Sequence, residues 1–145
     1  MITYLFRFCP LSFAQLTNAC NRPLGGGFLT GKLVNDQYAG TRFSEDNPLS
    51  KAMKKMYGGD GLLEAMRKFD TEAKAQGATP IEVAIRWLAH HSPLLEDDSI
   101  VIGASKTSHV TDIMEFIGKG PLPSPILGTV EEFWNAVRDT RGDMF

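Results

Sequence analysis

The sequence predicts an α/β protein whose parallel sheet is incomplete within this chain. Three observations carry this prediction. Short β-rich runs alternate with amphipathic helical segments along the 145 residues. The run at residues 99–103 is short and apolar, which is typical of a strand buried on both faces of a parallel sheet. Only two convincing strands are present, and two parallel strands leave open edges and uncovered faces.

The N-terminal region, residues 1–22, is atypical. Residues 2–8 are rich in β-branched and aromatic side chains and predict one strand, which the turn-forming Pro10 follows. Residues 12–22 are polar and aperiodic, so no regular element is expected there. The region carries Arg7 within its apolar run and lacks a small-residue cleavage site, which makes it a poor signal peptide.

Residues 48–77 predict two helices behind a glycine-dense loop at residues 23–32. Pro48 is placed to start a short helix that ends at Tyr57. A helix of about four turns follows, and Gly77 stands where its C-terminal cap belongs. The apolar face of this longer helix is formed by residues at helical spacing: Leu62, Met66, Phe69 and Ala73.

Two capping boxes, each a hydroxyl residue followed three positions later by a glutamate, mark helix starts further along the chain. Thr79 with Glu82 opens a helix that runs to about His91. Thr129 with Glu132 opens the last helix, after a proline-rich linker. Between these two helices lies another apolar helical stripe, formed by Val110, Ile113, Met114 and Ile117.

Composition excludes several classes of protein. Hydrophobic residues make up 43% and charged residues 22% of the chain, which rules out a disordered tail, a collagen-like repeat and a long coiled coil. A net charge of -2 supplies no general attraction to nucleic acid or to an anionic membrane. No run approaches the roughly 18–20 apolar residues that cross a bilayer, so a cytoplasmic location is expected.

The two cysteines, Cys9 and Cys20, are isolated in the sequence and are interpreted as reduced thiols. The histidines form no H-E-x-x-H pattern, and no metal site is expected. The pair at residues 90–91 follows a helix, where cations suit the negative end of the dipole, and is interpreted as structural or as surface residues. Trp87 and Trp134 fall on or beside apolar helical faces and are expected in the core.

The glycine-dense loop is the strongest local signal for an anion site, because backbone amides without a nearby Cβ can approach phosphate oxygens. Residues 26–32 match a P-loop up to Lys32, but Leu33 stands where a hydroxyl residue would hold magnesium, which disfavours a nucleotide hydrolase. A dinucleotide fingerprint also fails, because Thr30 takes the place of its third glycine. The alternative is a mobile loop at a turn.

A second anion-friendly segment lies at residues 103–108, between the apolar strand and a helix N-terminus. Free N–H groups and the positive end of the helix dipole point at the same place there. Ser105 and Lys106 can add side-chain donors. The alternative is simple capping of the helix by Thr107 or Ser108.

Four segments that are weak individually become specific together. They are PLGGGFLTGKL at residues 23–33, Thr41-Arg42-Phe43, ATPIEVAIRWLAHHSPL at 78–94 and IVIGASKTSHVTDIMEF at 100–116. In these segments the chain resembles the aldo-keto reductases, and among them the aflatoxin-aldehyde and aryl-alcohol reductase branches. The likeness extends over residues 23–141.

The resemblance implies the C-terminal part of a (β/α)8 barrel that reduces aldehydes or ketones with NADPH, the cofactor lying across the C-terminal ends of the strands. In the family, the glycine loop wraps the cofactor pyrophosphate, and the segment from Ser105 binds the adenosine 2′-phosphate and adenine. His109 stands where glutamine or arginine is usual. The implied cofactor-binding residues are Pro23, Leu24, Gly26, Gly27, Leu29, Lys32, Arg42, Ser105, Lys106 and His109.

The resemblance also implies that the catalytic residues are missing. The family's catalytic Asp, Tyr, Lys and His precede everything matched here, and Tyr4, Tyr38 and Tyr57 do not occupy the matching context. We therefore expect a truncated, partial NADP-dependent oxidoreductase domain over residues 1–145 that is inactive alone and prone to self-association. The alternative is a non-catalytic interaction fragment that associates with a complete barrel.

Overall fold

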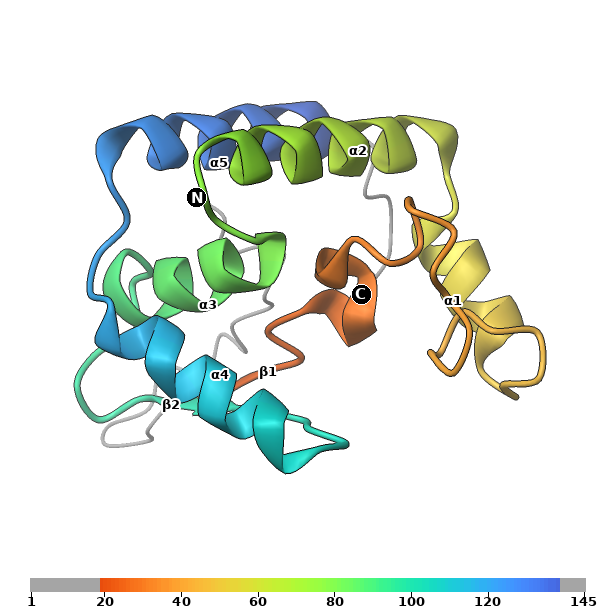
Figure 1. Ribbon diagram of the computed structural model, residues 1–145, viewed down its shortest axis with the longest axis horizontal. Coiled ribbons are helices and arrows are strands. Elements are labelled where there is room, and N and C mark those ends of the chain that lie inside the picture. The colour runs from red at the N-terminus through yellow and green to blue at the C-terminus, as the bar shows by residue number, and fades with distance from the viewer. Residues whose placement is uncertain (1–18, 139–145) are drawn as a thin grey trace, which may run out of the picture.

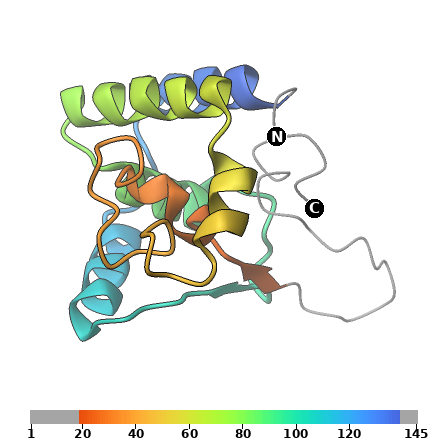
Figure 2. The same cartoon turned by 90° about the vertical axis from the view of Figure 1, so that its right-hand side faces the viewer.

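Helices dominate residues 19–138, the part of the chain that the computed structural model describes. Figures 1 and 2 show α2 and α5 side by side and antiparallel in one layer, with α3 and η2 in the middle. The strands and α4 lie on the far side, and α1 flanks the assembly. In chain order the elements are β1 (Ala19–Asn21), the 3-10 helix η2 (Gly25–Thr30), α1 (Ser50–Tyr57), α2 (Asp60–Ala75), α3 (Pro80–His90), β2 (Ser99–Val101), α4 (Thr107–Gly118) and α5 (Ser124–Val137).

The sheet consists of β1 and β2, which pair in parallel with Ala19 opposite Ser99. The parallel arrangement confirms the expectation from the sequence. β1, however, lies within the segment 12–22 for which no regular element was expected, and that prediction is wrong at Ala19–Asn21. Three residues are too few to display a two-residue period, so hydrophobic alternation could not reveal this strand. The strand predicted at residues 2–8 lies outside the described residues.

β2 occupies part of the run predicted at 99–103, but it is not buried on both faces. Ser99 and Val101 are exposed and Ile100 is half-buried. In the described part of the chain the sheet has only these two strands, and α4 packs on α3. The apolar side chains of β2 are therefore less buried, within the described residues, than its composition predicts.

The start and end signals of α2 and α3 are confirmed. Gly77, just beyond α2, has φ +76°, the left-handed conformation that glycine adopts at helix ends. Thr79 caps α3, and its Oγ1 accepts a hydrogen bond from the Glu82 amide at 3.1 Å. The apolar face predicted for α2 is buried, as are Trp87 and Trp134.

The capping box predicted at Thr129 is wrong. α5 begins at Ser124, with Pro125 in its first turn, where a missing N–H costs nothing. Thr129 is buried inside the helix, and its hydroxyl accepts a hydrogen bond from Gln76 Nε2 at 2.8 Å. The hydroxyl thus joins α5 to the end of α2, and the Phe69 and Phe133 rings, 4.8 Å apart, complete this contact.

α4 is a helix as predicted, but its apolar stripe does not form a buried face. Ile113 is 4% exposed, whereas Val110 and Met114 are 45% and 61% exposed. The stripe is therefore mostly outside the core. In the described residues the fold is α/β, with helices predominating and an open sheet. No helix in this part is both long and apolar enough to cross a membrane.

Candidate functional site

The glycine-dense loop folds into a tight 3-10 turn that only glycine permits at several positions. Gly25, Gly26 and Gly27 have φ of +57°, +67° and +104°, and Gly31, which ends the turn, has φ +73°. These angles disfavour residues with a Cβ. The glycines therefore serve first to let the backbone reverse sharply behind β1.

The turn closes largely on its own amides. The sequence had suggested instead that the backbone N–H groups of this loop are free to bind phosphate oxygens. Anion binding here therefore depends strongly on neighbouring side chains. Five amides already donate to protein oxygens. The Gly25 amide donates to Arg22 O, and the amides of Gly27 and Leu29 both donate to Leu24 O. The Gly31 amide donates to Phe28 O, and the Lys32 amide donates to Thr30 Oγ1.

Two guanidinium groups flank the start of the turn. A Cβ built on Gly26 would lie 3.6 Å from Nη1 of Arg42 and 2.7 Å from Cε, the flexible end of Met53, so it is the left-handed φ of +67° that favours glycine there. Burial raises the pKa of the Tyr57 hydroxyl, while the positive charges of Arg22 and Arg42 act against this rise. The positive charges of both arginines therefore act on the hydroxyl of Tyr57.

Tyr57 connects this cationic corner to the hydrophobic core. Its hydroxyl lies beside the turn, 3.5 Å from where a Cβ on Gly25 would be. Its ring stacks on Phe28, with centroids 4.9 Å apart, and meets Phe43 edge-on at 6.2 Å. The turn therefore rests on a rigid aromatic base.

The predicted loop residues divide into buried anchors and exposed cations. The side chains of Pro23 and Leu29 are buried, so they hold the turn in place and do not face solvent. Leu24 is half-buried. Lys32 and Arg42 are exposed and free to meet an anion from solvent.

The second segment presents an uncapped helix start. Lys106 precedes α4 in an extended conformation, and no side chain caps this N-terminus, contrary to the alternative of capping by Thr107 or Ser108. The first turn of α4 holds no acidic side chain. Ser105, Lys106 and His109 are all exposed. The positive end of the helix dipole is thus available to an anion.

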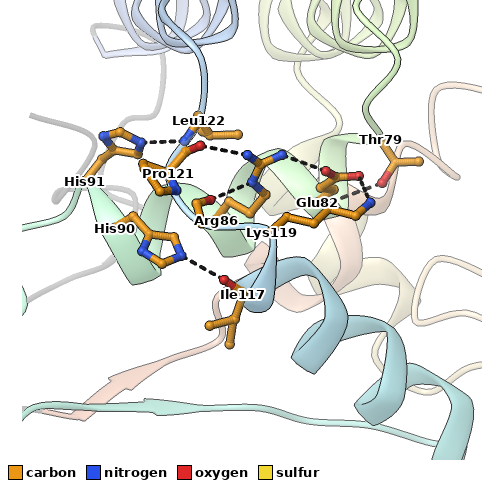
Figure 3. A network of polar contacts seen from close by, with 10 residues as sticks. Thr79, Glu82, Arg86, His90, His91, Ile117, Lys119, Pro121 and Leu122 are labelled. Carbon is orange, nitrogen blue, oxygen red and sulfur yellow. Dashed lines mark hydrogen bonds and ion pairs between the residues drawn. The ribbon is translucent and has the colours of Figure 1, made fainter.

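A buried polar network fixes the far end of α4 against α3 (Figure 3). Arg86 donates through Nε to Gly120 O at 2.9 Å and through Nη2 to Pro121 O at 2.7 Å. Its Nη1 donates to Oε1 of buried Glu82 at 2.8 Å, and Lys119 Nζ donates to the other Glu82 oxygen at 3.2 Å. Every charge of the network is paired, which is the condition for burying it.

The adjacent histidines belong to the same network, as their structural interpretation predicts. His90 Nε2 lies 2.9 Å from Ile117 O and donates to it, since a carbonyl only accepts. His91 Nε2 accepts from the Leu122 amide at 2.8 Å. Burial lowers the pKa of His91, and the charges of His90 and Arg86 lower it further.

α3 carries both candidate segments, because η2 and α4 each pack on it. The two segments do not meet, however. In both views the first turn of α4 stands apart from η2 (Figures 1 and 2). A ligand that uses both segments must therefore be long, with anionic groups at two places.

The remaining polar residues offer no competing centre. Among residues 19–138 there is no group of three or more His, Cys, Asp or Glu side chains suited to a metal ion. Cys20 is a free, buried thiol, and burial raises its pKa, which keeps it in the unreactive protonated form.

Comparison with known proteins gives the chain its family. A model described as "Aldo/keto reductase family" matches residues 11–135. The chain belongs to the aldo/keto reductase family. It is 31% identical over 121 residues to an aldo-keto reductase of Pseudocercospora fijiensis, a match that covers 80% of this chain and 40% of the relative.

Two further relatives are similar over comparable stretches. Oxidoreductase sirO of Leptosphaeria maculans is 28% identical over 119 residues, which is 81% of this chain and 36% of the relative. Aldo-keto reductase pigE of Monascus ruber is 24% identical over 131 residues, or 86% of this chain and 38% of the relative. The chain spans about two fifths of the length of these relatives.

Aldo-keto reductases generally use nicotinamide cofactors, and the residues present fit such a group. The match includes both candidate segments. A glycine turn with left-handed backbone angles, with the Arg42 guanidinium beside it and the positive charge of Arg22 nearby, suits a pyrophosphate. The helix start at Lys106 suits a further phosphate.

Reasoning from the sequence missed Arg22 and Tyr57 as neighbours of the glycine turn. Arg22 directly precedes the glycine loop, and its position next to Pro23 was an available signal. Tyr57 lies far from the loop in sequence and reaches it only because α1 folds back beside η2. No local pattern could have revealed that contact.

Proposed function

We propose that this chain forms the NADP-binding, C-terminal part of a (β/α)8 aldo-keto reductase that acts on an aldehyde or ketone. The observation that carries the proposal is the left-handed glycine turn with the Arg42 guanidinium beside Gly26, together with the positive charge of Arg22, which acts on Tyr57 at the same turn. Family membership supports the nicotinamide cofactor. The open two-stranded sheet supports the partial barrel.

In this proposal the turn and the α4 start hold the two ends of the adenosine diphosphate portion. Arg22, Arg42 and Lys32 neutralise the pyrophosphate at the glycine turn. Ser105, Lys106 and His109 receive the 2′-phosphate and adenine at the helix N-terminus. A phosphate bound by a lysine and a helix dipole favours NADP over NAD, which lacks that group.

When bound, the cofactor supplies the hydride that reduces a carbonyl carbon. The residues of this chain bind and orient the cofactor. Reduction also needs a general acid that gives a proton to the carbonyl oxygen. We assign that proton donor to the part of the family domain that lies before the matched segments, since Tyr57 packs under the turn among aromatic rings.

A nucleotide titration tests the binding half of the proposal. We expect the chain to bind NADPH more tightly than NADH or ATP. Arg42→Ala and Lys106→Ala should each weaken NADPH binding by about tenfold, the cost of one charge-assisted hydrogen bond. Lys51→Ala, which removes an exposed lysine of α1, is the matched control and should leave the affinity unchanged. Magnesium-dependent ATP binding without an NADPH preference would refute the proposal.

An activity assay tests the other half. The purified chain, free of host reductases, should not oxidise NADPH in the presence of 4-nitrobenzaldehyde, because we assign the general acid to the part of the family domain that lies before the matched segments. Turnover well above the background rate, lost in Arg42→Ala, would show that the chain carries its own proton donor.

A second candidate function, association with a complete barrel as a non-catalytic fragment, is favoured by the exposed apolar side chains of α4. Val110 and Met114 stand on one face of this helix, and Val101 of β2 is also exposed. Co-purification with a full-length relative, abolished by Met114→Lys, would support it. NADPH binding by the chain alone would favour the first proposal.

A further inference from the structure

The carboxylate of Asp70, on α2, is buried beneath the end of the glycine turn. Its side chain is 8% exposed. Its Oδ2 accepts a hydrogen bond from Asn35 Nδ2 at 3.0 Å and from Lys74 Nζ at 2.6 Å. A Cβ built on Gly31 would lie 3.1 Å from its Oδ1. Asp70 therefore meets the turn directly and also through Asn35.

Asn35 links Asp70 to the backbone of the turn by hydrogen bonds. Its Nδ2 donates to Gly31 O at 2.8 Å, and its own amide donates to the same oxygen at 3.2 Å. Gly31 ends η2 in the left-handed conformation, with its N–H bonded to Phe28 O. The exposed Lys32 comes next. The position of Asp70 thus sets both the close of the turn and the start of the segment that carries Lys32.

We infer that Asp70 is a positioning residue for the phosphate-binding turn: through Asn35 and Gly31 it fixes where Lys32 meets the cofactor. The inference rests on the proposed function, because Lys32 has this role only if the turn holds cofactor phosphates. Asp70 itself does not touch the cofactor. Lys74 neutralises its charge, so that a buried carboxylate can stand close to an anion site.

The sign of one substitution separates positioning from simple electrostatics. A negative charge near a phosphate site repels the ligand, so an effect of charge alone predicts tighter NADPH binding in Asp70→Asn. Positioning predicts weaker binding, because Asn35 and Lys74 lose their charged partner and the turn loosens. Asp60→Asn is the matched control, since it removes one exposed negative charge from the same helix.

Hydrogen exchange of the full chain without cofactor tests the contact itself. Amides of residues 28–37 should exchange about tenfold faster in Asp70→Asn than in the wild type, as expected for one lost charge-assisted bond. The same amides should be unchanged in Asp60→Asn. Equal exchange in Asp70→Asn and the wild type would overturn the inference. Asn35→Ala repeats the test and leaves the Asp70–Lys74 pair intact.

NADPH titration tests the consequence for binding. The dissociation constant should rise about tenfold in Asp70→Asn and in Asn35→Ala, and stay within about twofold in Asp60→Asn. Unchanged or tighter binding by Asp70→Asn would overturn the positioning role. Failure of the wild-type chain to bind NADPH would instead overturn the proposed function, and the exchange experiment would still decide whether Asp70 holds the turn.

Discussion

Gly31 shows how strictly single positions define the glycine turn. It combines a left-handed φ of +73° with a close approach to Asp70. Gly77 has nearly the same φ, +76°, but nothing lies within 4 Å of the place a Cβ would take. Backbone strain acts at both positions, whereas crowding acts only at Gly31.

This pair separates strain from crowding in a stability measurement. Gly77→Ala should lower the free energy of unfolding by about 1 kcal/mol, the cost of placing a Cβ in the left-handed region. Gly31→Ala should cost about 2 kcal/mol or more, because the contact with Asp70 adds to the strain. Urea denaturation of both variants gives the comparison. Equal losses of unfolding free energy in the two variants would show that the turn and Asp70 shift to accommodate the added Cβ.

His91 makes stability depend on pH. Its pKa is lowered in the folded chain by burial first and then by the nearby charges of His90 and Arg86, and a protonated Nε2 could not accept from the Leu122 amide. The unfolded chain therefore binds the proton more readily, and stability is full above pH 6.5 and is lost as pH falls below it. Urea midpoints at several pH values should show this loss in the wild type.

Substitution assigns the effect to this histidine. His91→Gln should remove that part of the pH dependence, because glutamine does not titrate. His90→Gln is the control, since it leaves His91 and its contact with the Leu122 amide in place and should therefore keep most of the slope. A slope that survives in His91→Gln would locate the proton at another group.

Individual residues also show the limits of sequence patterns. Thr79 and Thr129 stand in the same hydroxyl-to-glutamate spacing, yet Thr79 caps α3 and Thr129 lies inside α5. Pro125 allowed α5 to begin earlier, and Gln76 supplied Thr129 with a partner from α2. A local motif predicts a cap only when no tertiary contact offers the hydroxyl an alternative.

At the scale of elements, hydrophobic periodicity located the helices but did not decide what covers them. The stripe of α2 is buried against α5, whereas much of the stripe of α4 remains exposed. Both stripes look alike in the sequence. Burial depends on which other elements pack against a helix, and the hydrophobic pattern of that helix alone carries no information about them.

The two faces predict very different mutational costs. Phe133→Ala should cost about 3–5 kcal/mol, because its buried ring packs on Phe69 between α2 and α5. Met114→Ala should stay within about 0.5 kcal/mol, since that side chain is 61% exposed. Thermal unfolding of both variants distinguishes them. A comparable loss in Met114→Ala would mean that the α4 face is covered in solution.

At the scale of the molecule, the α/β class, the parallel pairing and most helix positions followed from the sequence. The position of β1 did not follow from the sequence, because three residues are too few to show a period in hydrophobicity. The candidate site was identified in the sequence through its glycine loop and the start of α4, and Arg22 could have been added because it directly precedes the loop, whereas Tyr57 meets the loop only through folding. Long-range contacts of this kind have no local signal.

The open sheet and the exposed face of α4 lead to a prediction about association. We expect sedimentation velocity to show species heavier than 16.0 kDa that increase with concentration, because sheet edges and apolar side chains favour contact between copies. Val110→Lys with Met114→Lys should reduce this association. A single 16.0 kDa species with one cooperative thermal transition would show instead that the chain is self-sufficient.

In the proposed complex one dinucleotide spans the glycine turn and the start of α4. Hydrogen exchange with and without NADPH tests it most directly, because it reports each segment separately and tolerates association. NADPH should protect residues 22–33 and 103–110 together, and NADH, which has the adenine but lacks the 2′-phosphate, should protect residues 103–110 less than NADPH does. Protection confined to other elements, or absent from both segments at saturating NADPH, would contradict it.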